Sequence, residues 1–357
     1  METLPYPKSL EQAHLQSIVW KAPKYFIGFF HCSLITFQSA NIILFPDKRI
    51  SISLLVLMFY QAIVNYRAYK SRKQFLLIIK KVSNGMSLLS SVDKCRNLMM
   101  SVLGYYVLVA SLTMIYAILY YSSRRYKLLI IVITESEFLS KKMEGLLIVV
   151  TDINIVIGTT ITTLVFSSIS VYYGLVCIYF VTLCRGLKIQ KRNVKDSWEC
   201  ERVIYAYLKI RKIVESLENF MCSSAFIIVV SSMTGLFYMS YTLILTPKDG
   251  YKDYVCYMSG VIYHCSIIGI VIGSASAANR AAENTKEAVM SLPGIFPKCY
   301  NELKAILRKD CKQQVCLTLW KMYKIDRSII ITAMGVLLNY GILVATLGTV
   351  SKCNDKT

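Results

Sequence analysis

The stretch SIIITAMGVLLNYGILVATLGTV, residues 328–350, decides the fold class of this chain. It is 23 residues long and contains no charged side chain. A helix that crosses about 30 Å of hydrocarbon needs about 20 apolar residues, because each residue advances it by about 1.5 Å. The stretch is therefore expected to be a transmembrane helix.

The polar residues of this stretch are regularly spaced. Thr332, Asn339 and Thr346 are seven residues apart, which is close to two helical turns, so they share one face of the helix. Small residues make a second face on which another helix can approach closely. Such a helix suits the lining of a pore. The alternative is a helix inside a bundle whose polar groups bond to its neighbours.

The composition of the whole chain places it among polytopic membrane proteins. Of its 357 residues, 55% are hydrophobic, and the mean hydropathy is +0.48. The net charge of +20 would suggest nucleic acid in a soluble protein, but here it is better explained as loop charge that sets topology. The chain lacks nucleophile-elbow, zinc-protease, P-loop and dinucleotide motifs. We therefore expect no enzyme, no metal site, no cofactor and no nucleic acid partner.

The hydropathy pattern predicts an all-α fold with seven transmembrane helices. They are expected at about 25–45, 50–66, 98–121, 153–183, 221–245, 254–278 and 328–350. The remaining parts are an N-terminal segment at 1–24, a helical loop at 184–220, a basic anchor segment at 279–327 and a short tail at 351–357. Apolar residues of helical period in the loop indicate that it extends one of the flanking helices: Val203, Tyr207, Ile210, Ile213, Val214 and Leu217.

The distribution of Lys and Arg predicts the orientation. Of 41 such residues, 30 lie in the N-terminal segment and in the loops after the second, fourth and sixth spans. Because positive residues favour the cytosol, the N-terminus is expected inside and the C-terminus outside. Rhodopsin-type receptors have the opposite topology. Cys256 and Cys353 both lie near the predicted outer face and are able to pair, although reduced thiols are the simpler expectation.

Two further patterns concern helix packing. A ridge of small residues in the sixth span, each four apart, predicts close approach of a neighbouring helix; it comprises Gly269, Gly273, Ala277 and Ala281. A row of hydroxyls in the fourth span either bonds back to its own backbone or lines a polar cavity; it comprises Thr160, Thr163, Ser167 and Ser170.

Aromatic residues gather in the predicted outer halves of several spans. An interfacial aromatic belt explains those near the membrane surface. Tyr263 and His264 lie about ten residues deeper, and an ionisable residue at such depth is a functional candidate, although a neutral packing histidine is the alternative. A pocket for a small organic ligand is the functional interpretation.

The C-terminal residues resemble a known family. Ile325–Ile330 reads IDRSII, and Asn339-Tyr340-Gly341-Ile342-Leu343-Val344-Ala345-Thr346-Leu347 follows. This looks like the C-terminal signature of arthropod gustatory receptors, in which Thr-Tyr precedes five hydrophobic residues and Gln-Phe. Here Tyr340 and the spacer match, whereas Asn339, Thr346 and Leu347 stand where Thr, Gln and Phe are usual.

The resemblance implies a fold similar to that of insect odorant receptors, with four subunits around a pore lined by the seventh helix. It implies that residues 185–221 and 279–327 make the main contact between subunits. The pore-lining residues that it implies are Thr332, Asn339, Leu343 and Thr346. The ligand pocket that it implies draws on Tyr116, Thr160, Tyr238, Tyr241, Tyr257 and His264.

The sequence therefore favours a gustatory receptor: a ligand-gated, non-selective cation channel in the plasma membrane, opened by a small tastant. Homomeric and heteromeric tetramers remain open, with membrane lipid and permeant cations as the other partners. The alternatives are a seven-helix metabotropic receptor, a small-molecule transporter, and an accessory subunit that conducts only beside a partner.

Overall fold

The computed structural model describes the central part of the chain. It covers residues 94–121, 159–192, 197–245 and 251–292, most of 316–326, and scattered positions within 32–70, 145–156 and 328–339. The predicted first, second and seventh spans lie outside the described residues except at those scattered positions. Cys353, Tyr340, Leu343, Thr346 and Leu347 also lie outside them.

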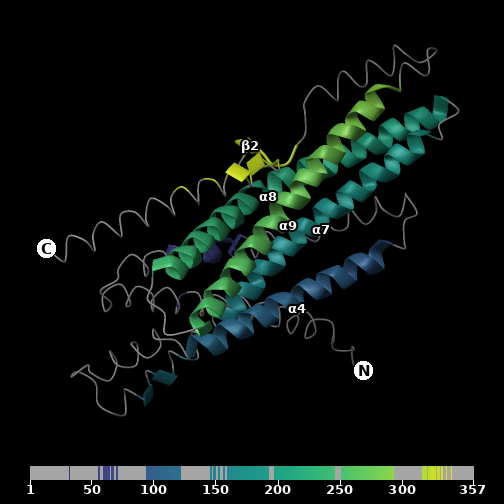
Figure 1. Cartoon of the computed structure of the whole chain (residues 1–357). Helices are drawn as coiled ribbons and strands as arrows, with labels where there is room; N and C mark the ends of the chain where they lie inside the picture. Colours follow the sequence, from purple (N-terminus) through teal and green to yellow (C-terminus); the bar gives the residue numbers. More distant parts are fainter. Residues whose placement is uncertain are drawn as a thin grey trace, which may run out of the picture.

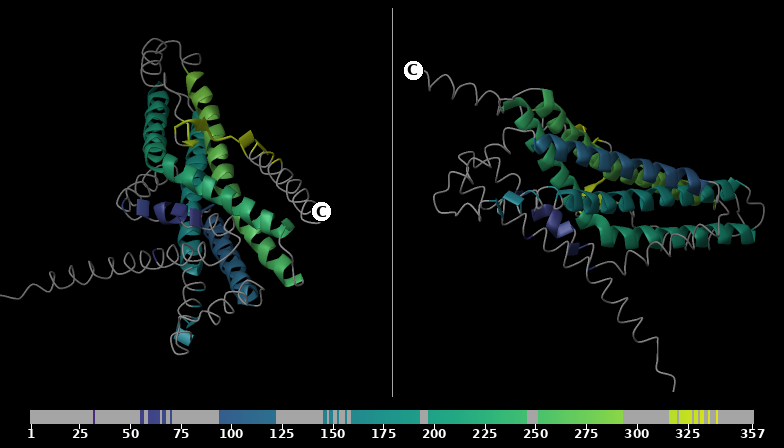
Figure 2. Two further views of the ribbon diagram at one scale, coloured as in Figure 1. Left: turned by 90° about the vertical axis from the view of Figure 1, so that its left-hand side faces the viewer. Right: turned by 90° about the horizontal axis from the view of Figure 1, so that it is seen from below.

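Four long helices form an elongated bundle (Figures 1 and 2). They are α4 (Lys94–Tyr121), α7 (Thr159–Arg192), α8 (Ser197–Leu245) and α9 (Tyr251–Met290). Segments of α7, α8 and α9 are long and apolar enough to cross a membrane, judged by length and composition. The chain is thus mostly helical in its described part and has three candidate membrane spans.

The helix α8 joins two stretches of different character without a break. Its 49 residues give a length of about 74 Å, which is more than twice the thickness of the hydrocarbon core of a bilayer. The first half is rich in charge, and the second half is apolar. Glu199 in the first turn complements the helix dipole, and the helix ends two residues before Pro247. Part of α8 therefore extends beyond the bilayer if the apolar half spans it.

The helix α9 lies at the centre of the bundle and contacts α4, α7 and α8. Its buried face includes Ile267, Val271, Ile272 and Ala275, all fully buried. At Gly174 of α7 an added Cβ would lie 2.8 Å from the Ile270 side chain, so α7 and α9 approach closely there. Close packing around α9 thus sets the positions of the polar residues that it carries.

The glycines of the predicted small-residue ridge on α9 make no such close approach to the described helices. Gly269 and Ala277 are exposed, and a Cβ added at Gly269 or Gly273 meets nothing within 4 Å among the described residues. Of the ridge, only Ala281 packs against the described core, so close approach of another helix along the rest of the ridge stays a prediction.

Candidate functional site

His264 lies in the interior of the bundle, packed against the backbone of α8. It is 3% exposed, and its ring stacks edge-on with Tyr263 at a centroid distance of 5.0 Å. A Cβ at Gly235 of α8 would overlap the imidazole ring. The Nδ1 atom is buried without a hydrogen-bond partner among the residues that the structure describes. A buried polar atom without a partner is costly, so His264 is a candidate for binding a polar group of a ligand.

The Gly235→Ala substitution is expected to destabilise the protein by about 1–3 kcal/mol, because the new methyl group must displace the His264 ring from a packed interior. Thermal unfolding of the purified, solubilised protein measures this as a lower Tm. Gly269→Ala on α9 is the matched control, because its Cβ meets no described atom within 4 Å. Equal Tm values for the two variants would contradict the close contact between Gly235 and His264.

Tyr263 links α9 to α7 through its hydroxyl group. The Ser167 hydroxyl donates a hydrogen bond of 3.3 Å to the Tyr263 hydroxyl, which itself donates one of 3.2 Å to the Thr163 carbonyl. Tyr105 of α4 brings its buried hydroxyl near Ser167 and Ser266, without a hydrogen bond of normal geometry. Hydroxyl groups of α4, α7 and α9 therefore gather around the Tyr263 hydroxyl.

The other hydroxyls of the fourth-span row bond back to their own helix. Thr160 donates to the Val156 carbonyl at 2.7 Å, and Thr163 donates to the Thr160 carbonyl at 3.0 Å. Ser170 donates to the Phe166 carbonyl at 3.0 Å. Of the two interpretations of this row, back-bonding therefore holds for the hydroxyls of Thr160, Thr163 and Ser170, whereas the Ser167 hydroxyl bonds to α9.

The predicted aromatic residues come together in part. Tyr238 and Met239 of α8 form a buried cluster against which Tyr241, Tyr257 and Val261 pack. Because Tyr257 and His264 are seven residues apart, they lie on the same face of α9. Thr160 belongs to α7, and Tyr116 is a residue of α4 whose side chain is not among those described. The described contacts place neither of these two in the cluster.

Two of the predicted pore-lining residues are among those described. Thr332 is exposed in the single chain, and its hydroxyl donates to the Ser328 carbonyl at 3.0 Å. Asn339 is also helical and exposed. The side chains of Thr332 and Asn339 are therefore not covered within the single chain.

The sequence analysis did not predict a set of hydrogen bonds further along α8 and α9, which we call the clamp: Asn279 and Glu218 bind the backbone of a short hairpin. Strands β1 (Thr318–Leu319) and β2 (Tyr323–Lys324) form an antiparallel hairpin. Asn279 of α9, 5% exposed, donates from Nδ2 to the carbonyls of Leu317 and Ile325, both at 2.9 Å. Its Oδ1 accepts from the Leu317 amide at 2.7 Å. One side chain therefore binds both the entry and the exit of the hairpin.

A second helix holds the same hairpin. The carboxylate of Glu218 on α8 accepts hydrogen bonds from the Thr318 amide, at 2.9 Å, and from the Thr318 hydroxyl. The only sequence signals were a carboxylate at the polar–apolar junction of α8 and an amide in the alanine-rich part of α9. Neither residue reveals its partner in the local sequence, because Thr318 is 100 residues from Glu218 and Leu317 is 38 residues from Asn279.

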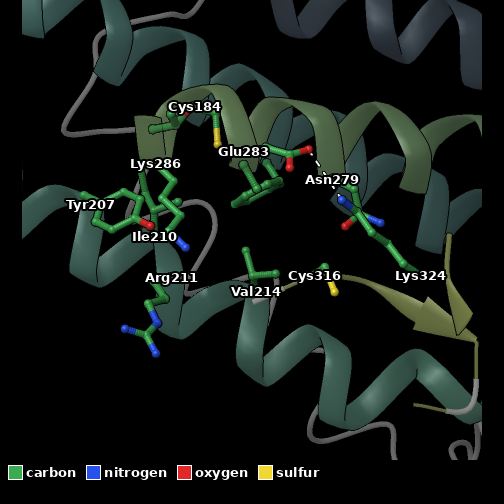
Figure 3. A pocket seen from close by; sticks show the side chains of 13 residues that line it. Cys184, Tyr207, Ile210, Arg211, Val214, Asn279, Glu283, Lys286, Cys316 and Lys324 are labelled. Carbon is green, nitrogen blue, oxygen red and sulfur yellow. Dashed lines mark hydrogen bonds and ion pairs between the residues drawn. The ribbon is translucent and has the colours of Figure 1, made fainter. Parts of the chain in front are cut away.

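A cavity of about 40 Å³ lies beside the hairpin, between α7, α8 and α9 (Figure 3). Its lining includes Cys184, Tyr207, Val214, Asn279, Thr285 and Cys316. At its edge Lys324 pairs with Glu283 at 3.4 Å, and both side chains are well exposed, so the ion pair contributes little stability. Ligand pockets usually measure about 300–1,000 Å³, so this cavity holds at most a few waters. Burial raises the pKa of the Cys316 thiol, which favours its protonated form.

Comparisons with known proteins identify the fold. No family model matches the chain, and no curated protein matches it. Solved structures of an insect olfactory receptor do match it. The structure of OR5 from Machilis hrabei is 13% identical, with a TM-score of 0.69, and the match covers 96% of this chain and 92% of that one. The same receptor in complex with eugenol gives 11% identity and a TM-score of 0.71, over 97% and 93% of the two chains. The chain therefore has the fold of an insect olfactory receptor.

Proposed function

We propose that this chain is a chemoreceptor subunit of the gustatory type, forming a ligand-gated cation channel in the plasma membrane. The observation that carries the proposal is the likeness to the receptor OR5 over nearly the whole of both chains. Membrane-spanning length and composition in α7, α8 and α9 support it. The proposal includes seven spans, at the positions expected from hydropathy, with the N-terminus in the cytosol and no enzymatic activity.

The proposed ligand site lies around His264, Tyr238, Tyr241 and Tyr257, together with Tyr116 and Thr160. Support comes from the buried histidine nitrogen without a partner and from the aromatic residues packed along the same face of α9. Aromatic walls and a few polar groups suit a small organic molecule. The neighbouring receptor was solved in complex with eugenol, a molecule of this kind.

The proposed pore is the axis of a tetramer, lined by Thr332, Asn339, Leu343 and Thr346. Four copies of a neutral polar stripe give a hydrated path, and an apolar ring such as Leu343 closes it by dewetting. The ligand opens this path only to the extent that it binds the open state more tightly than the closed state.

Recordings from excised membrane patches test this function, with the chain expressed in a heterologous cell line and a panel of tastants applied. We expect cation currents that persist when G-protein signalling is blocked, because the chain itself conducts. Patches from untransfected cells are the control. Currents that vanish under the block, or an N-terminal tag that antibodies reach in intact cells, would instead indicate a metabotropic receptor. Saturable uptake without single-channel steps would indicate a transporter.

A further inference from the structure

The hairpin beside the bundle is too short to be stable by itself. Each strand has two residues, paired as Thr318 with Lys324 and Leu319 with Tyr323. Isolated two-stranded hairpins are at best marginally stable, even when longer. The side chains of Leu317, Leu319 and Ile325 are buried, and the backbone is bound by Asn279 and Glu218. The hairpin therefore takes its position from α8 and α9.

The last apolar segment begins directly after this anchored point. Ile325, whose carbonyl accepts from Asn279, lies three residues before Ser328. The Ile329 amide donates to the Asp326 carbonyl at 3.2 Å, so the first helical turn starts next to Ile325. Only two residues separate Ile325 from Ser328, where the last apolar segment begins. The clamp therefore fixes the position at which that segment starts.

The same two helices carry the candidate ligand cluster. His264 and Asn279 are both in α9 and 15 residues apart, or about 22 Å along a helix. Gly235 and Glu218 are both in α8 and 17 residues apart, or about 26 Å. Neither helix is broken between its two positions, so a shift of α8 against α9 at the cluster reaches the hairpin through rigid elements.

We propose that Asn279 and Glu218 are positioning residues that fasten the start of the last apolar segment to α9 and α8, and that through them ligand binding is transmitted to the pore. The proposal rests on the proposed channel function for its second half. The first half, that Asn279 and Glu218 hold the start of the last apolar segment, can be tested without recording any channel current.

Hydrogen exchange of the purified full-length protein tests the fastening. In Asn279→Ala, amide exchange in peptides covering 316–326 and 328–335 is expected to be about tenfold faster or more, because three hydrogen bonds to the hairpin backbone are lost. Asn284→Ala, at an exposed position on α9, is the matched control and leaves both peptides unchanged. Unchanged exchange in 316–326 overturns the clamp, and faster exchange there alone overturns the link to the last segment.

Substitutions at Glu218, which remove fewer hydrogen bonds than Asn279→Ala, control for misfolding of the hairpin. Glu218→Ala removes both acceptors for Thr318, whereas Glu218→Gln keeps an oxygen for the Thr318 amide and an NH₂ group for its hydroxyl. We expect faster exchange in the first variant and near-normal exchange in the second. Glu215→Ala, exposed one turn earlier on α8, is the control. Equal exchange in Glu218→Ala and Glu215→Ala contradicts the role of the carboxylate.

Dose–response recordings test the transmission. In Glu218→Ala the maximum response is expected to fall about threefold or more relative to surface expression, with ligand affinity in a binding assay unchanged, and Glu218→Gln restores it. An unchanged maximum response beside faster exchange overturns the transmission. If the wild-type protein gives no current at all, the proposed channel function fails, and the exchange experiment still decides the clamp.

Discussion

Replacing Asn339 with leucine is expected to reduce the single-channel conductance severalfold while leaving ligand binding unchanged. Asn339 is exposed in the single chain, in the middle of a segment without charged residues. If four copies face one axis, the substitution removes four amides from a narrow hydrated path and favours its dewetting. Single-channel recordings under saturating ligand measure the conductance, and a radioligand or fluorescence assay measures binding.

Asn339→Gln is the matched variant, because it keeps the amide on a side chain longer by one methylene group. It is expected to retain most of the conductance. If leucine and glutamine have the same effect, the position acts through its size rather than its polarity. Normal conductance in Asn339→Leu would mean that this face packs against lipid or another helix, and the proposed pore would then be wrong.

Replacing His264 with alanine is expected to have the opposite signature, a ligand response shifted to about tenfold higher concentration with normal conductance. A tenfold shift corresponds to about 1.4 kcal/mol, the size of one good hydrogen bond to a neutral ligand group. The reason is the buried Nδ1 atom, which has no partner in the described part of the chain and so remains available to a ligand. Dose–response curves and direct binding measure the shift.

Cys265→Ala tests whether this effect is local, because Cys265 is the next residue on α9 and is exposed. It is expected to leave the response unchanged. A lower Tm in His264→Ala without any shift in ligand affinity would show that the imidazole serves only to fill the space beside Gly235. The ligand cluster would then have to lie elsewhere in the bundle.

The sequence predicts the helices well where apolar periodicity is strong. The six residues spaced with helical period between Val203 and Leu217 are all buried on α8. Their pattern is visible because a helix that packs on one side must repeat its apolar residues every three to four positions. The charged residues between them mark the opposite face, so the helical reading of this basic stretch needs no knowledge of its partners.

Close helix contacts are harder to predict. The small-residue ridge at Gly269 and Gly273 is a clear pattern, but these glycines make no close contact with the described helices. Among the described glycines, the tight contacts occur at Gly174, Gly235 and Gly260, which belong to no such ridge. A single glycine becomes a contact point only because a large side chain of another helix lies opposite, and that side chain is not visible in the local sequence.

The hairpin could not be predicted for a related reason. Its strands contain two residues each, too few for alternation of polar and apolar residues to be recognised. Its stability comes from Asn279 and Glu218, which are distant in sequence. A short element held by long-range hydrogen bonds leaves no local signal.

The hydrogen bonds of the clamp can form only late in the synthesis of the chain. Asn279 is made 38 residues before Leu317, and Glu218 is made 100 residues before Thr318. Until the ribosome has added Leu317 and Thr318, the Asn279 amide and the Glu218 carboxylate lack these partners. Nascent chains that stop short of residue 325 would therefore leave the Asn279 amide and the Glu218 carboxylate without the complete set of partners that they have in the finished fold.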